Sequence, residues 1–208
     1  MKLHPHQVYH VYNRGNNRKQ LFYELENYPY FMEKMRTYIT PHCDLLGYVL
    51  LPNHFHFLIH ANEETILPYD RPVKSKETLK DNPRVQMSRF SHGVQLLLSS
   101  YAKAINKRHD RTGSLFAQNT HWKMTSSDAH LSDYSLQCFI YILNNPVKAG
   151  LVQSPDEWPY SSYREYLGLS TSPLCNLALG KKLLSLEINE LIKFEGVEIP
   201  DHIISKIF

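Results

Sequence analysis

The apolar segment CDLLGYVLLPNHFHFLIHA, residues 43–61, is the feature that most constrains the fold. It contains two runs rich in aliphatic and aromatic residues, separated by a Pro-Asn dipeptide. Pro and Asn are typical of turns, so the segment predicts two adjacent β-strands joined by a hairpin. Successive side chains of a strand point to opposite faces. His54 and His56 therefore share one face of the second strand, and the two phenylalanines beside them face the core.

The hydrophobic spacing elsewhere predicts further helices and strands around this hairpin. We expect a strand in residues 6–15, a helix in 27–40, the hairpin, a polar loop in 61–83, a helix in 84–109, a strand in 112–125, and a helix in 126–145, capped by Ser127 or Asp128 and ending before Pro146. The first six regular elements match the β-α-β-β-α-β order of a ferredoxin-like fold. The expected class is α+β, with one antiparallel sheet and helices on one face. Residues 1–150 would form this unit, and residues 151–208 would form a C-terminal extension packed on the core.

The composition narrows the class of protein. Hydrophobic residues make up 42% and charged residues 21% of 208 positions, which is ordinary for a globular chain. Cys43, Cys138 and Cys175 are odd in number and lack CxxC spacing, so neither a disulfide framework nor a zinc knuckle is expected. A reducing cytoplasm fits this cysteine content. The chain starts without the apolar region of a signal peptide, and no apolar run reaches the ~18–20 residues that span a bilayer. We expect no membrane association.

The positive charge is clustered, although the net charge is only +3. Residues 84–111 contain six Lys or Arg against one acid, and the loop NRGNNRK, residues 13–19, adds three more cations. Such patches suit a polyanion such as nucleic acid, although each patch alone could be a solvated face. The candidate phosphate contacts are Arg14, Arg18, Lys19, Lys107, Arg108 and Lys123, and an exposed aromatic such as Trp122 could stack on an unpaired base.

Two imidazoles on one strand face can bind a single metal ion, but a bare pair is more often an ordinary part of a sheet. A third ligand near the pair would favour a metal site over an ordinary pair of sheet histidines. Tyr141 and Asn145 are four residues apart on the predicted last helix, so they share a helix face. An Asn carbonyl can bind a metal, and a deprotonated Tyr phenol is a nucleophile. Taken singly, Tyr141 could instead be a core aromatic and Asn145 a cap at the helix end.

Four motifs occur in a fixed order: GYVLLPNHFHFLIH, NKRHDRTGSLFAQ, YILNNPVKAGLV and WPYSSY. In this order they resemble the single-tyrosine HUH transposases, in particular the branch of REP-associated tyrosine transposases. The opening segment HVYNRGNNRKQLF is similar as well. The resemblance covers about residues 6–163.

The resemblance implies roles for individual residues. His54 and His56 would be the metal ligands of the HUH motif, Asn145 the third ligand, and Tyr141 the nucleophile. The implied ion is Mg²⁺ or Mn²⁺. Two alternatives stay open: Asn144 could be the ligand if the helix end unwinds, and Tyr101 is a rival nucleophile.

The expected function is metal-dependent cleavage and strand transfer of hairpin-bearing single-stranded DNA through a 5′-phosphotyrosine intermediate, that is, DNA transposition. The resemblance is compatible with a monomer or a homodimer. One alternative is a catalytically silent protein of the same fold that binds nucleic-acid hairpins. Another is a small-molecule metal hydrolase, which would need a further His or carboxylate near His54. Asp44, on the preceding strand, is the only obvious candidate in the sequence.

Overall fold

The predicted hairpin is present. β2 (Asp44–Leu51) and β3 (His54–His60) pair antiparallel around a turn at Pro52-Asn53. β1 (Val8–Arg14) pairs antiparallel with β3, and β4 (His121–Met124) pairs antiparallel with β1, which gives the strand order β2-β3-β1-β4. The structure is a computed structural model that describes residues 3–70, 87–125, 133–186 and 191.

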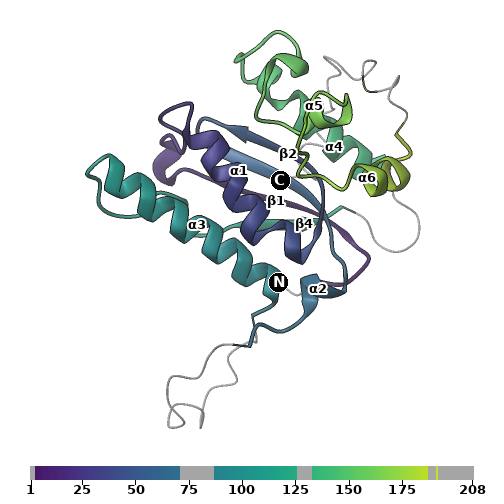
Figure 1. Cartoon of the computed structure of the whole chain (residues 1–208), viewed down its shortest axis with the longest axis horizontal. Helices are drawn as coiled ribbons and strands as arrows, with labels where there is room; N and C mark the ends of the chain where they lie inside the picture. The colour runs from purple at the N-terminus through teal and green to yellow at the C-terminus, as the bar shows by residue number, and fades with distance from the viewer. Residues whose placement is uncertain (1–2, 71–86, 126–132, 187–190, 192–208) are drawn as a thin grey trace.

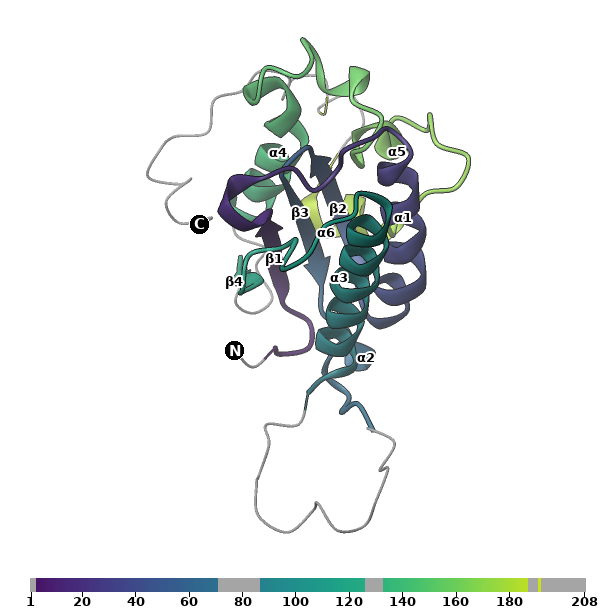
Figure 2. The same ribbon diagram turned by 90° about the vertical axis from the view of Figure 1, so that its left-hand side faces the viewer.

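Two long helices cover one face of the sheet (Figures 1 and 2). They are α1 (Asn27–Tyr38) and α3 (Arg89–Arg108), and they pack against each other. The Phe31 ring of α1 lies 5.6 Å from Phe55 of β3 and 4.9 Å from Tyr101 of α3, measured between centroids. The phenylalanine face of β3 is therefore the core face, and the predicted α+β, ferredoxin-like class is confirmed.

A further helix, α4 (Asp133–Lys148), lies on the opposite face against β2 and β3 (Figure 2). It approaches the sheet closely because Gly47 has no side chain: a Cβ there would lie 2.9 Å from the Phe139 ring. The prediction that this helix ends before Pro146 is wrong. Pro146 lies in the last turn, where it removes one backbone hydrogen bond without breaking the helix. The chain leaves the helix at Gly150, whose φ of 66° is typical of a residue that follows a helix end.

The remaining helices are short. They are η1 (Asn16–Arg18), η2 (Thr40–His42), α2 (Glu63–Ile66), η4 (Pro155–Glu157), α5 (Tyr163–Tyr166) and α6 (Leu177–Leu184). α2 lies inside the stretch expected as a polar loop, and the Asn62 side chain caps it through the Thr65 N–H. The rest of that stretch from residue 71 on, and the caps expected at Ser127 or Asp128, lie outside the described residues.

The segment after α4 covers the free edge of β2. The Leu50 N–H donates to the Tyr160 carbonyl, and the Ser162 N–H donates to the Tyr48 carbonyl, both at 2.9 Å. Trp158 adds a bond from its indole nitrogen to the Leu50 carbonyl at 3.0 Å. The WPYSSY motif thus satisfies strand groups that an exposed edge would leave unpaired.

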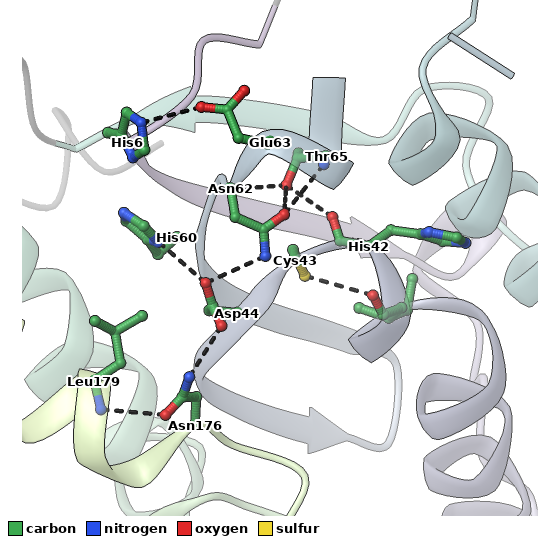
Figure 3. A network of polar contacts seen from close by, with 11 residues as sticks. His6, His42, Cys43, Asp44, His60, Asn62, Glu63, Thr65, Asn176 and Leu179 are labelled. Carbon is green, nitrogen blue, oxygen red and sulfur yellow. Dashed lines mark hydrogen bonds and ion pairs between the residues drawn. The ribbon is translucent and has the colours of Figure 1, made fainter. Parts of the chain in front are cut away.

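Polar contacts, most of them buried, hold the C-terminal extension against the sheet. The Glu165 carboxylate accepts hydrogen bonds from the Tyr48 hydroxyl and from the Leu174 and Cys175 N–H groups, at 2.9–3.0 Å. At the start of β2, Asp44 accepts a bond from the Asn176 side chain at 2.9 Å (Figure 3). The domain boundary near residue 150 stays a prediction. None of the helices in the described part of the chain is long and apolar enough to cross a membrane.

Candidate active site

A cleft of about 420 Å³ opens where the β2-β3 turn meets the loop after β1. Strand register brings its walls together, because Tyr12 of β1 is directly opposite both His56 of β3 and His121 of β4. Arg14 is likewise opposite His54. The cleft is lined by Tyr12, Asn13, Arg14, Arg18, Asn53, His54, His56 and His121.

His54 and His56 lie side by side on this face, as strand alternation predicts. Their ring centroids are 5.0 Å apart and the ring planes are perpendicular. The His54 Nδ1–H donates to Asn53 Oδ1 at 2.6 Å, and Nδ1 of His56 is hydrogen-bonded to Nε2 of His10 at 2.9 Å. Such bonds through one nitrogen orient the rings of metal-binding histidines. Both residues would therefore bind a metal ion through Nε2.

The electrostatic surroundings suit metal ligands. Burial lowers the pKa of His54, and burial together with His10 holds the pKa of His56 well below its usual range. Both imidazoles are thus neutral near pH 7, which is the form that binds metals. The described residues contain no group of three or more His, Cys, Asp or Glu placed to hold a metal. Within the described part of the chain, a third protein ligand would therefore come from another residue type.

Helix α4 places Tyr141 and Asn145 beside the two histidines that line this cleft. The Tyr141 ring is perpendicular to His56, with centroids 5.7 Å apart. The Asn145 side chain interacts with both His54 and the Tyr141 phenol. At each of them it opposes the larger effect of burial, which lowers the pKa of His54 and raises that of Tyr141. Asn145 Nδ2 is buried without a hydrogen bond of standard geometry. An amide between a histidine pair and a phenol fits a third ligand.

The two alternatives from the sequence are placed elsewhere. The Asn144 side chain donates to the Ile140 carbonyl of its own helix at 3.2 Å. Tyr101 is fully buried among Phe22 and Phe31 on the core face, and its hydroxyl donates to the Leu21 carbonyl at 2.9 Å. Tyr101 is thus a packing residue, and only Tyr141 of these two tyrosines is at the cleft.

Burial raises the pKa of the Tyr141 phenol, and the interaction with Asn145 opposes this effect. The phenol is therefore protonated at neutral pH. A cation is close to it: the Lys148 Nζ lies 5.6 Å from the Tyr141 ring centroid.

The loop NRGNNRK presents cations at the mouth of the cleft. Gly15 is required there, because a Cβ would overlap the Lys19 carbonyl oxygen. Asn17 and Arg18 both have left-handed backbones, with φ of 53° and 59°. Such strain persists only where the surroundings fix the loop. The fixed loop places Arg18 among the residues that line the cleft.

The other predicted DNA contacts are divided between the two faces. Lys123 is opposite His10 and shares the histidine face, and Lys19 is exposed at the end of the loop NRGNNRK. Lys107 and Arg108 lie at the end of α3 and are not among the residues that line the cleft, and Arg108 is ion-paired with Glu24. Trp122 is half-buried on the core face with its ring against Phe90, 5.3 Å between centroids. The expectation of an exposed Trp122 is therefore corrected.

Sequence reasoning missed several residues of this region, among them His10, Tyr12, His121 and Lys148. The first two alternate along YHVYNR in the same way as the two histidines of β3, so a signal was present. Their closeness to His56 depends on the β1-β3 pairing, which no local pattern specifies.

A solved structure of a REP-associated tyrosine transposase bound to a REP hairpin is similar to this chain, with a TM-score of 0.54 and 16% sequence identity. The match covers 84% of this chain and 87% of the other. The two chains share a fold. No protein-family model and no curated protein matched the sequence.

Proposed function

We infer that this chain is a single-tyrosine transposase of the HUH type that cleaves and rejoins single-stranded DNA beside a hairpin. The observation that carries this inference is that Tyr141 and Asn145 lie beside His54 and His56, which line one cleft. The arginines at the same cleft suit a phosphate backbone. The shared fold with a hairpin-bound tyrosine transposase supports the choice of hairpin DNA as substrate.

The residues divide the chemistry between them. His54, His56 and Asn145 would hold a divalent ion, Mg²⁺ or Mn²⁺, which when bound neutralises charge developing on the scissile phosphate. Tyr141 Oη attacks phosphorus as its proton passes to solvent water, and the exposed Lys148 ammonium lies over the Tyr141 ring. As the Tyr–O–P bond forms, the bond from phosphorus to the 3′ oxygen breaks, and the 3′ oxygen takes up a proton from water. The products are a 5′-phosphotyrosine and a free 3′-OH, and a second 3′-OH can reverse the step to join a new end.

The small-molecule hydrolase is the weaker interpretation. It needs a further His or carboxylate at the histidine pair, and Asp44 is instead bonded to His60, Asn62 and Asn176 at the other end of β2 and β3 (Figure 3). The described residues also offer no acidic metal cluster. A cleft with arginines and two histidines suits phosphodiester chemistry better.

The test is covalent capture. Wild-type protein is incubated with a pool of hairpin-bearing single strands and Mn²⁺, and adducts are separated on denaturing gels. We expect an adduct that mass spectrometry maps to Tyr141, loss of the adduct in Tyr141→Phe, and an unchanged adduct in Tyr101→Phe. Phe keeps the ring, so DNA binding should survive. An adduct that persists in Tyr141→Phe contradicts the assignment, and hairpin binding without any adduct favours the silent binding protein.

A further inference from the structure

Two aromatic rings form a parallel pair on the face of the sheet that carries the cleft. Tyr12 of β1 and His121 of β4 are directly opposite each other in the strand register. Their ring centroids are 5.0 Å apart and their planes differ by 11°. Both residues line the cleft, and His121 is exposed whereas Tyr12 is half-buried.

The pair lies between the candidate catalytic residues and the cations. Tyr12 is opposite His56 on its other side, and the closeness of Tyr12 contributes to the raised pKa of Tyr141. Arg14 and Arg18 line the same cleft. Among the described residues neither arginine is ion-paired with an acid. Flat aromatic groups beside uncompensated cations suit a nucleotide, because bases stack on rings and phosphates pair with guanidinium groups.

The distance between His56 and His121 matches the distance between a phosphate and the base of the neighbouring nucleotide. His121 is two strands away from His56, which corresponds to about 10 Å across the sheet. A phosphate at the histidine pair and its flanking base are separated by a distance of this order. Trp122 is the aromatic residue that the sequence predicted to stack on a base, but its ring faces the core. The preceding residue, His121, faces the cleft instead.

We propose that His121, with the Tyr12 ring packed behind it, forms a stacking subsite for the unpaired base next to the phosphate that His54 and His56 receive. This inference rests on the proposed function, since it takes single-stranded DNA as the occupant of the cleft. Stacking is tolerant of sequence, so the subsite would position the strand for cleavage without selecting one base.

The experiment uses a DNA hairpin with a single-stranded oligo(dT) tail, fluorescently labelled, and the same hairpin with a tail of abasic residues. The abasic tail keeps the phosphates and removes the bases. Affinities are measured by anisotropy in EDTA, so that neither metal binding nor cleavage contributes. We expect wild type to bind the oligo(dT) tail more tightly, by about 5- to 150-fold. His121→Ala should remove this difference, and His121→Phe should restore it.

A matched control separates the subsite from aromatic residues in general. Tyr30 is an exposed tyrosine on α1, which covers the other face of the sheet, so Tyr30→Leu should keep the full difference. Equal binding of the two tails by wild type, or an unchanged difference in His121→Ala, would overturn the proposal. Because the measurement excludes divalent ions, absence of the Tyr141 adduct would defeat the proposed catalysis without changing this result.

Discussion

Nε2 of His10 lies 2.9 Å from Nδ1 of His56, and both side chains are buried. The rings are nearly parallel, with centroids 5.1 Å apart. One nitrogen of this pair donates and the other accepts, so the bond orients the His56 ring and couples the tautomers of the two rings. A His56 Nδ1–H that donates to His10 leaves Nε2 of His56 with the lone pair that a metal ion needs. His10 thus orients His56 in the same way that Asn53 orients His54, where Asn53 Oδ1 lies 2.6 Å from His54 Nδ1.

We predict that His10→Ala weakens Mn²⁺ binding by about 10- to 100-fold, the usual effect of losing a group that orients a metal ligand. Isothermal titration calorimetry without DNA measures this directly. His60→Ala is the matched control. His60 lies on the same strand and face as His56, but it pairs with Asp44 away from the cleft. Circular dichroism establishes that both variants are folded. Unchanged Mn²⁺ affinity in a folded His10→Ala protein would contradict this role.

Local patterns were sufficient to predict the sheet and its helices. Alternation in LPNHFHFLIH placed His54 and His56 on one face and Phe55 on the other, and the structure confirms both placements. Helical spacing also placed Tyr141 and Asn145 on one side of α4, and in the structure that side lies beside the histidines. The sharing of a face depends only on neighbours in the chain, which is why the sequence predicts it, whereas the packing of α4 against the sheet depends on distant residues.

The errors arise where the outcome depends on distant residues. β4 is only four residues long, so its own pattern did not decide which of His121 and Trp122 faces the core. The pairing with β1 decides it, because Trp122 is opposite Val11 on the core side. In the same way, Pro146 was taken as a helix stop, although a proline in a last turn costs a single hydrogen bond.

The Asn145 amide gives a prediction that separates a ligand from a helix cap. Asn145→Asp should tighten Mn²⁺ binding, because a carboxylate adds negative charge among neutral imidazoles and suits Mn²⁺. Asn145→Ala should weaken it by at least the ~10-fold expected when an orienting group is lost. Calorimetry measures both Mn²⁺ affinities. The unfolding midpoints of the variants in EDTA should stay similar, because the helix hydrogen bond at this position joins the Ala149 N–H to the Asn145 backbone carbonyl and does not use the Asn145 side chain. Equal Mn²⁺ affinities for the three proteins would remove Asn145 from the ligand set.

The stability of the metal-free protein should fall as the pH falls below about 6.5. The folded pKa of His56 is well below its unfolded value, and that of His54 is also lowered, so the unfolded chain binds protons that the folded chain does not. The free energy of unfolding then decreases with falling pH, by up to about 1.4 kcal/mol per pH unit for each such group. Thermal unfolding between about pH 7 and pH 5 measures this. In His56→Asn the slope should be shallower, and an identical slope would show that His56 does not contribute.

Salt dependence of DNA binding should distinguish cations at the cleft from those elsewhere. Arg18 lines the cleft, whereas Arg108 at the end of α3 is ion-paired with Glu24. Each phosphate contact contributes about −0.7 to the slope of log K against log salt for a single strand, because it releases condensed counterions. Arg18→Ala should therefore make the slope shallower by about 0.7, whereas Arg108→Ala should leave it nearly unchanged. Anisotropy titrations of one labelled single strand over a series of KCl concentrations give both slopes. A larger change in Arg108→Ala than in Arg18→Ala would move the DNA path from the cleft to the α3 end.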